Sequence, residues 1–281
     1  MGIETLAYGY GLIEGPRPAP DGSLYFSDVH GGGVRRLHAD GSIELVVPKR
    51  RGVGGIALHA DGGLVISGKN ICHVRDGVTR VLYARDDVGG FNDLHTDAAG
   101  RVYVGSLRDD PFSTAAERRT GDAYRIDADG QVVTLYDGVG LSNGIGFSPD
   151  GRRMYHADTV STGIVAHDFD DGNIVAGSRR MFATLTRGMP DGLAVDTEGG
   201  VWVASYGGGC VTRFAPDGSF DRHIDVPARE VTSLCFAGTD LDELIVVTAD
   251  NTDDASRGGT IFRLSADLVG VLGLPTPLAR V

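Results

Sequence analysis

The chain lacks the features that mark several large classes of protein. No apolar run approaches the roughly 20 residues that span a membrane, and residues 1–7 lack the basic region and apolar core of a secretory signal. There is no block of lysine and arginine, and the net charge is −12, which disfavours non-specific binding to nucleic acid. We therefore expect a cytoplasmic protein that binds neither a membrane nor nucleic acid.

Signatures of common catalytic and metal sites are also scarce. The three cysteines, Cys72, Cys210 and Cys235, are scattered and form no CxxC pair, so we expect a reduced protein without a disulfide framework. None of the 8 histidines falls in an HExxH or similar zinc pattern. Ser27 and Ser205, at the ends of predicted strands, lack the G-x-S-x-G elbow of serine hydrolases. A zinc protease and a serine nucleophile at either position are therefore not expected.

Glycine, by contrast, is abundant, with 43 residues, about twice its average share. Five D-G or similar turns, each followed by an alternating apolar strand, recur along the chain, which is the pattern of a β-hairpin. A sixth, degenerate copy lies near residue 241. The turn positions lie 38 to 51 residues apart, at Gly22, Gly62, Gly100, Gly151, Gly199 and Leu241.

Repeats of this length, made of strands and turns, are typical of propeller blades. The sequence predicts an all-β fold, a six-bladed β-propeller with four-stranded blades, formed by residues 1–281 as a single domain. Residues 5–10 are expected to pair with the last blade around residues 259–264 and to close the ring, which removes exposed edges. The interval Leu107 to Thr120 leaves room for an inserted loop, a candidate lid.

Six equivalent positions, each eight residues before a turn position, are expected to form a ring. In a propeller the first strand of each blade lines the central channel, so these residues should lie at one height. They are Glu14, Gly54, Asn92, Asn143, Asp191 and Ser233. All the polar members are oxygen donors, and two are carboxylates, which suits a hard divalent cation such as Ca²⁺. Without an ion, two carboxylates in a channel would repel or hold a proton.

The motifs around these positions resemble one family. Glu14-Gly15-Pro16, Asn92-Asp93, Ser142-Asn143-Gly144 and Pro190-Asp191-Gly192 are similar to motifs of the SMP-30/gluconolactonase/regucalcin family, and the likeness covers nearly the whole chain. The resemblance implies a six-bladed propeller with one divalent metal in its channel. It implies that the metal ligands are Glu14, Asn143 and Asp191, that Asp191 is also the general base, and that Asn92 and Asp110 contact substrate.

One departure from the family's pattern concerns the substrate. Sugar-lactone members often carry arginine two residues before the asparagine that matches Asn92, whereas this chain has Gly90 there, followed by Phe91. Gly90 and Phe91 are therefore expected to border a larger, less polar substrate site, suited to a bulkier or less hydroxylated lactone or ester than gluconolactone. The alternative is that Arg108, or another residue of the insertion, supplies the missing cation.

The predicted function is that of a divalent-metal-dependent hydrolase, foremost a lactonase acting on a small-molecule lactone or ester. The metal would polarise the carbonyl and Asp191 would take a proton from the attacking water. Ca²⁺ is the first expectation for the cofactor, with Zn²⁺, Mn²⁺ and Mg²⁺ as alternatives. Two other functions stay open, hydrolysis of a phosphotriester or activated ester at the same metal, and a non-catalytic calcium-binding propeller, because a fold alone does not determine activity.

Overall fold

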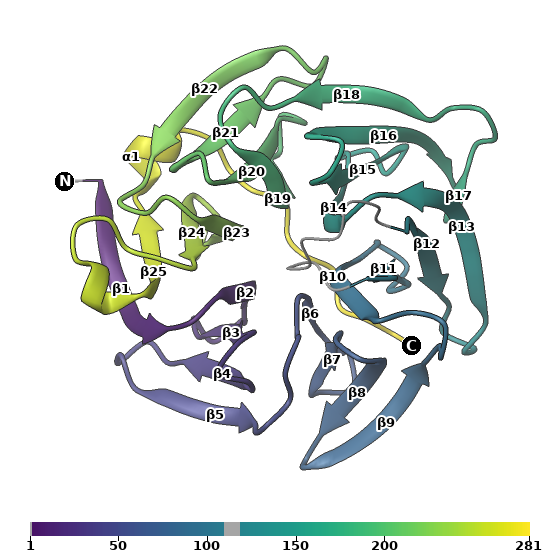
Figure 1. Ribbon diagram of the computed structural model, residues 1–281, viewed down its shortest axis with the longest axis horizontal. Helices are drawn as coiled ribbons and strands as arrows, with labels where there is room; N and C mark the ends of the chain where they lie inside the picture. Colours follow the sequence, from purple (N-terminus) through teal and green to yellow (C-terminus); the bar gives the residue numbers. More distant parts are fainter. Residues whose placement is uncertain (1, 110–118) are drawn as a thin grey trace.

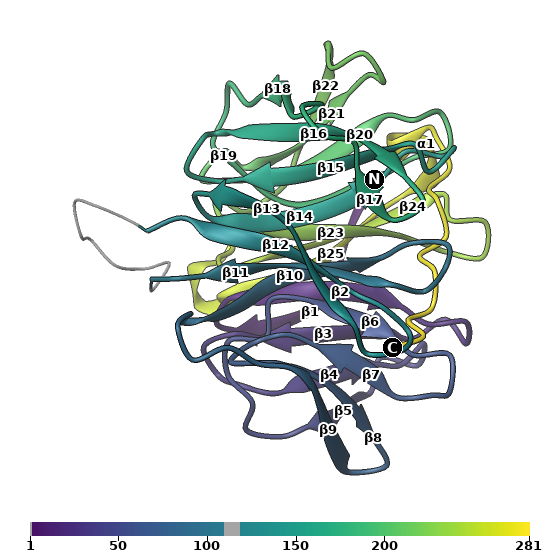
Figure 2. The same ribbon diagram turned by 90° about the vertical axis from the view of Figure 1, so that its right-hand side faces the viewer.

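Strands make up nearly the whole structure, and they form six antiparallel sheets around a central axis (Figure 1). The structure is a computed structural model that describes residues 2–109 and 119–281. Each sheet is a blade whose first strand faces the axis, and the blades pack side by side around the ring (Figures 1 and 2). The six-bladed β-propeller predicted from the repeats is confirmed.

The first three blades each have four strands in sequence order. Blade 1 contains β2 (Ile13–Pro18), β3 (Leu24–Asp28), β4 (Val34–Leu37) and β5 (Ile43–Val47). Blade 2 contains β6 (Ile56–Leu58), β7 (Leu64–Ile66), β8 (Ile71–Arg75) and β9 (Val78–Tyr83). Blade 3 contains β10 (Gly90–Thr96), β11 (Val102–Leu107), β12 (Gly121–Ile126) and β13 (Val132–Val139).

The last three blades depart from this plan at two places. Blade 4 contains β14 (Ser142–Phe147), β15 (Arg153–Asp158), β16 (Gly163–Asp170), β17 (Asn173–Ile174) and β18 (Arg180–Thr184). Blade 5 contains β19 (Met189–Val195), β20 (Val201–Tyr206), β21 (Cys210–Phe214) and β22 (Phe220–Asp225). Blade 6 contains β23 (Val231–Ala237), β24 (Glu243–Thr248), β25 (Gly259–Leu264) and β1 (Ile3–Tyr10). The extra strand of blade 4 arises because the long β16 pairs with both β17 and β18.

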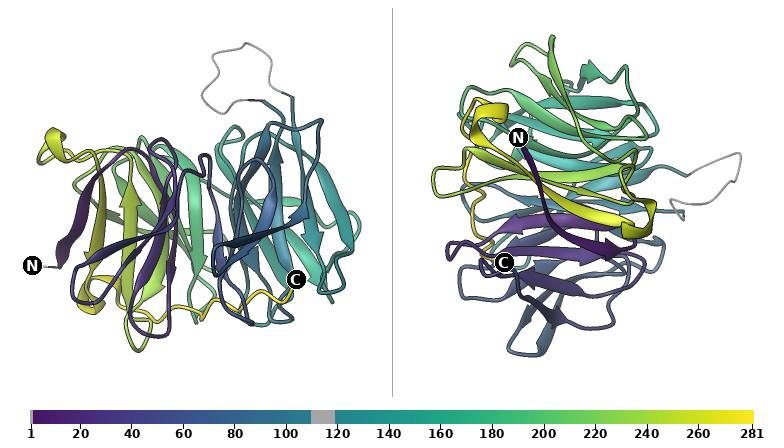
Figure 3. Two further views of the ribbon diagram at one scale, coloured as in Figure 1. Left: turned by 90° about the horizontal axis from the view of Figure 1, so that it is seen from below. Right: turned by 90° about the vertical axis from the view of Figure 1, so that its left-hand side faces the viewer.

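The two ends of the chain both contribute to ring closure. Strand β1 pairs antiparallel with β25, with Ile3 opposite Leu264 and Tyr10 opposite Gly259, so the predicted pairing is confirmed. The segment after the short helix α1 (Ala266–Val269) runs along one face of the ring, from blade 5 to blade 2 (Figure 3). It bridges Asp196 through Gly273 and His59 through Ala279. A 3₁₀ turn (Ala255–Arg257) completes the helical content of the described residues. None of their helices is long and apolar enough to cross a membrane.

The turn glycines adopt the conformation that the repeat requires. All five have a positive φ, between 67° and 89°, and each backbone N–H donates to the carbonyl three residues earlier, at 2.8 to 3.0 Å. Leu241, the sixth turn position, has a φ of 58°. The repeat is therefore a repeat of left-handed turn positions, which glycine adopts without strain.

A buried polar network shows what holds one blade together. The carboxylate of Asp196 is fully buried and accepts hydrogen bonds from Trp202 Nε1 and Arg213 Nε, each at 2.8 Å. Trp202 is itself fully buried and packs with Phe236 of the next blade, as expected for a core residue. Because Asp196 is paired with a guanidinium, its burial is compensated.

Candidate functional site

The starts of the inner strands border a cavity of about 710 Å³ at one end of the channel. Its lining includes five of the six predicted ring positions, Glu14, Gly54, Asn92, Asn143 and Asp191. The later residues of the same strands, such as Arg17, Asp93, Ile145 and Leu193, line a second cavity of about 520 Å³. The two cavities therefore lie toward opposite ends of the inner strands.

Ser233, the sixth ring position, lies on the second cavity and not on the first. The turn is not the cause, because Leu241 donates its N–H to Gly238 O as the turn glycines do to the carbonyl three residues earlier. The register irregularity lies elsewhere in β23, between Val231 and Ser233, and leaves Thr232 between the paired residues, with its hydroxyl bonded to the backbone. Counting eight residues back from Leu241 therefore ends at Ser233, on the turn side of this irregularity.

Register irregularities occur in the inner strands of the four blades that carry the polar ring residues. They lie between Glu14 and Arg17, Phe91 and Leu94, Ser142 and Ile145, and Pro190 and Leu193. Such a bulge bends the strand and re-aims a side chain that a regular ladder would place elsewhere. Each of these four polar ring residues lies within or at the edge of such an irregular segment. The repeated irregularity therefore explains why all four border the same cavity.

Gly54, the ring position without a side chain, makes room for its neighbour. A Cβ at residue 54 would lie 2.1 Å from Asn92 Oδ1. Any larger residue would displace the Asn92 amide or push blades 2 and 3 apart. Gly54 therefore belongs to the site because it permits the position of Asn92.

Hydrogen bonds link the amides of blades 3 and 4 to the backbone of blade 5. Asn92 Nδ2 donates to Asn143 Oδ1 at 2.6 Å and to the carbonyl of Ser142 at 2.8 Å. Asn143 Nδ2 donates to Thr159 Oγ1 at 2.7 Å, and that hydroxyl donates to Pro190 O, also at 2.7 Å. With its nitrogen held by Thr159, Asn143 keeps an oxygen with a spare lone pair on the side of Asn92.

The two ring carboxylates are buried without a compensating charge. Glu14 and Asp191 are each 7% exposed, and neither forms an ion pair within residues 2–109 and 119–281. Burial raises the pKa of Glu14 well above its usual range, and repulsion from Asp191 and Asp93 raises it further. Burial also raises the pKa of Asp191 well above its usual range, with Asp93 adding to the effect. Asp93 lies deeper in the channel, where burial raises its pKa to about 6.

This donor set fits a hard divalent cation. Two buried carboxylates and an oriented amide oxygen, all on one cavity, are the ligand types that Ca²⁺ and Mg²⁺ prefer. A cation would also counteract the rise in both pKa values, since an opposite charge favours the ionised form. Among the described residues no group of three or more His, Cys, Asp or Glu side chains is placed to hold a metal, so a site here depends on the Asn143 amide.

The residues expected to bind substrate are placed differently from one another. Gly90 and Phe91 both border the cavity, but the Phe91 ring is 1% exposed and packs against Tyr83 and Tyr124, with centroids 5.4 and 6.1 Å away. Phe91 therefore offers the cavity little of its aromatic face. Asp110 and most of the 107–120 insertion lie outside the described residues, so their expected roles stay predictions.

The absence of a side chain at Gly90 has a steric cause. A Cβ there would lie 2.9 Å from the carbonyl oxygen of Gly68, because residue 68 pairs with Phe91 in an isolated antiparallel bridge. The space beside Gly90 is thus filled by the connection between β7 and β8, which narrows the enlarged site expected from the glycine. The next residue of that connection is Lys69, which borders the cavity.

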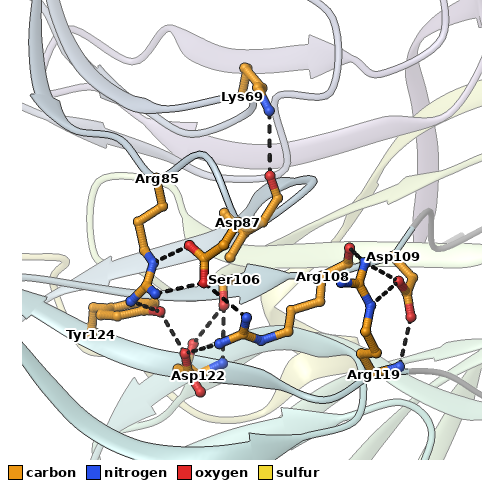
Figure 4. A network of polar contacts seen from close by, with 10 residues as sticks. Lys69, Arg85, Asp87, Ser106, Arg108, Asp109, Arg119, Asp122 and Tyr124 are labelled. Carbon is orange, nitrogen blue, oxygen red and sulfur yellow. Dashed lines mark hydrogen bonds and ion pairs between the residues drawn. The ribbon is translucent and has the colours of Figure 1, made fainter.

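Arg108, the alternative source of a cation, is held by other groups. Its guanidinium donates to Asp87 at 3.0 Å and to Asp122 at 2.9 Å, and it does not border the cavity (Figure 4). Arg85 shares Asp87, with two hydrogen bonds of 2.7 Å. Because these ion pairs hold the Arg108 guanidinium, Lys69 is a better candidate than Arg108 for a cation that contacts substrate beside Gly90.

A buried serine–histidine pair lies beside the site. Ser142 Oγ is 2.8 Å from His156 Nε2, and the other nitrogen of His156 contacts the Tyr136 hydroxyl. Residues 140–144 read G-L-S-N-G and so match G-x-S-x-G, the motif that Ser27 and Ser205 lack. Ser142 is fully buried at the start of β14, not exposed on a strand-to-helix turn. The pair therefore holds the strand that carries Asn143, and no substrate can reach its hydroxyl.

Two further cavity residues are not among the predicted ring positions. Thr159 follows β15 and fixes the Asn143 amide, and Tyr206 ends β20. Burial raises the pKa of Tyr206 to about 12, and the neighbouring Glu230, to which the hydroxyl is hydrogen-bonded, adds to the effect, so the hydroxyl stays protonated. Tyr206 lies seven residues after its turn glycine, the same spacing as Val29, Lys69 and Leu107, which also border the cavity, so counting forward from the turns would have found it. Thr159 has no such signal.

Comparisons with known proteins agree on one group of relatives. The family model of the SMP-30/gluconolactonase/LRE-like region matches residues 12–250. The chain is 34% identical over 276 residues to a pentonolactonase of Haloferax volcanii, covering 92% of each protein. It is 33% identical over 268 residues to regucalcin of Sus scrofa, covering 90% of this chain and 89% of the other. The solved structure of regucalcin from Agrobacterium tumefaciens, described as a calcium-binding protein, superposes with a TM-score of 0.85 at 25% identity, covering 100% of this chain and 98% of that one.

Proposed function

The chain belongs to the SMP-30/gluconolactonase/LRE-like family, and from this we propose that it is a lactonase that requires one divalent cation bound by Glu14, Asn143 and Asp191. The observation that carries the proposal is the pair of buried, unpaired carboxylates beside an oriented amide on one cavity. The pentonolactonase relative supports lactone hydrolysis, and the relative described as calcium-binding supports Ca²⁺ as the cation.

Each polar residue then has a defined role. A divalent cation bound here supplies a Lewis acid for the lactone carbonyl. Asp191, ionised once a cation compensates its charge, accepts a proton from the attacking water at a carboxylate oxygen. Asn92, held by its bonds to Ser142 and Asn143, orients the substrate or that water.

Elemental analysis of protein purified without chelator tests the cation, and about one equivalent per chain is expected. Hydrolysis of gluconolactone and of simple γ- and δ-lactones should disappear after chelation and return when Ca²⁺, Mg²⁺, Mn²⁺ or Zn²⁺ is added. Protein that is metal-free as isolated and gains no activity from any of these ions contradicts the proposal.

The alternatives of the sequence analysis are outcomes of the same assay. A phosphotriester and an aryl ester are included in the panel, and turnover of these without turnover of any lactone would reassign the reaction. Stoichiometric cation binding with no turnover of any panel member would identify a binding protein.

A further inference from the structure

Two cations on the cavity wall have no carboxylate partner among the described residues. Arg51, in the connection between β5 and β6, and Lys69, between β7 and β8, both border the cavity and are both exposed. Neither forms an ion pair in the part of the chain that the structure describes. Lys69 Nζ reaches one backbone group, the carbonyl of Val88, at 3.4 Å, so most of its hydrogen-bonding capacity is unused.

Neighbouring charges on the same side of the molecule are neutralised. Figure 4 shows Arg85 and Arg108 held by Asp87 and Asp122, while Lys69 points to a carbonyl oxygen. Asp109, the described acid on this wall, is bound by Arg119 through its backbone N–H and its guanidinium, at 2.6 to 2.8 Å. Around Arg51 and Lys69, away from the ring carboxylates Glu14 and Asp191, the uncompensated charge is therefore positive, although the protein as a whole carries a net charge of −12.

The Cα of Lys69 lies close to the point at which the side chain of a larger residue at position 90 would begin. The Cβ of any such residue would lie 3.8 Å from the Lys69 Cα. The chain therefore has a cation beside Gly90, but it comes from the neighbouring blade. Lys69 is also one of only two lysines in the sequence, the other being Lys49.

Much of the remaining cavity lining is apolar. It includes Leu12, Val29, Leu141, Val160 and Met189, from several blades. Apart from the ring amides and Thr159, this lining offers few partners for the several hydroxyls of a sugar lactone, and unmatched hydroxyls would lose hydrogen bonds to water on binding. A substrate with an apolar body and one anionic group matches this distribution.

The geometry points to Arg51 and Lys69 as specificity-determining residues that bind a carboxylate on the substrate, so that the preferred substrate is a lactone with a free carboxylate away from the ring carbonyl. This inference rests on the proposed lactonase function. A monoanion fits better than a dianion such as a phosphate ester, because Glu14 and Asp191 border the same cavity and repel added negative charge.

A matched pair of substrates tests the inference. The γ-lactone of 2-hydroxyglutarate carries a carboxylate on its ring, and the primary amide of that carboxylate is an uncharged analogue of nearly the same shape. For the wild type, kcat/KM should be about 10-fold or more higher for the carboxylate, the effect expected of a charged hydrogen bond. In Lys69→Met this ratio should fall about 5- to 10-fold, and in the double variant with Arg51→Met it should approach one.

Three further measurements make the result specific. Lys49→Met removes the same charge from the other lysine, which does not border the cavity, and should leave the ratio unchanged. Added 0.5 M NaCl should lower the wild-type ratio toward that of the double variant. Hydrolysis of the uncharged amide lactone should be within about twofold of wild type in all variants.

The outcomes separate this inference from the proposed function. A carboxylate preference that persists in the double variant, or equal rates for the two lactones in the wild type, overturns the inference and leaves the lactonase intact. If neither lactone is hydrolysed, the lactonase proposal fails, and titration calorimetry still tests the cations. If the carboxylate lactone binds more tightly than its amide and this difference is lost in Lys69→Met, the carboxylate-binding role of the two cations is supported. Equal binding of the two lactones overturns that role.

Discussion

Replacing Asp191 by asparagine should stabilise the metal-free protein while abolishing turnover. Asp191 and Glu14 are each 7% exposed and have no ion-pair partner among the described residues. Asparagine keeps the size of the side chain and can still accept the hydrogen bond that the backbone N–H of Gly192 donates to residue 191. The substitution therefore removes one uncompensated buried charge and little else.

The size of the effect follows from two costs that the substitution removes, the burial of the Asp191 charge, which is the larger, and its repulsion by Asp93. For scale, two like charges about 4 Å apart repel by about 4 kcal/mol at the effective dielectric of a protein site, and partial protonation relieves some of both costs. We expect a gain of about 1–3 kcal/mol in the free energy of unfolding, or roughly 2–10 °C in Tm for a chain of this size.

The gain should depend on pH in a defined direction. Both carboxyl groups have a folded-state pKa raised above the unfolded value. Their protonated forms therefore favour folding below the unfolded pKa, and this stability is lost as the pH rises through the folded pKa. The advantage of Asp191→Asn should accordingly be largest near neutral pH and vanish below about pH 4.

Thermal unfolding with chelator, followed by circular dichroism from pH 4 to pH 8, measures the gain. Asp196→Asn is the matched control, because Asp196 is equally buried but bonded to Arg213, and its loss should destabilise by about 3–5 kcal/mol. Added Ca²⁺ should raise the Tm of the wild type and have little effect on Asp191→Asn. A metal-free Asp191→Asn protein with a Tm below that of the wild type at pH 7.5 would refute the reasoning.

The remaining predictions concern residues around the ring. Thr159→Val should lower kcat/KM about 10-fold, because the Asn143 amide loses its acceptor; Thr159→Ser should restore the rate, and failure to do so would argue for a packing role. Gly54→Ala should displace Asn92, 2.1 Å from the new Cβ, and reduce kcat/KM by about 10², whereas wild-type kinetics would exclude Asn92 from the reaction. Arg108→Ala should change lactone kinetics less than about twofold, because its guanidinium is engaged by carboxylates away from the cavity, and a large rise in KM would contradict that.

Local patterns were enough to predict the architecture. Each turn glycine supplies a left-handed conformation within a few residues of the strands it joins, so the turns and their spacing are visible in the sequence. Ring closure by residues 5–10 was also predictable, because an apolar segment left over at the start of the chain suits an open edge at the end. Counting from the turns identified Glu14, Asn92, Asn143 and Asp191, since each inner strand starts at nearly the same distance from its turn.

Contacts between residues on different strands and different blades decided what the sequence alone could not. From the sequence, Gly90 predicts extra space in the substrate site. In the structure the carbonyl of Gly68 occupies that space, and Lys69, the next residue of blade 2, lies beside it. Thr159 orients Asn143, and Asp87 and Asp122 hold Arg108, through pairs separated by 14 to 21 residues. A repeat fixes where each strand begins, but which groups face one another across the channel depends on how neighbouring blades pack, and no spacing within one blade encodes that.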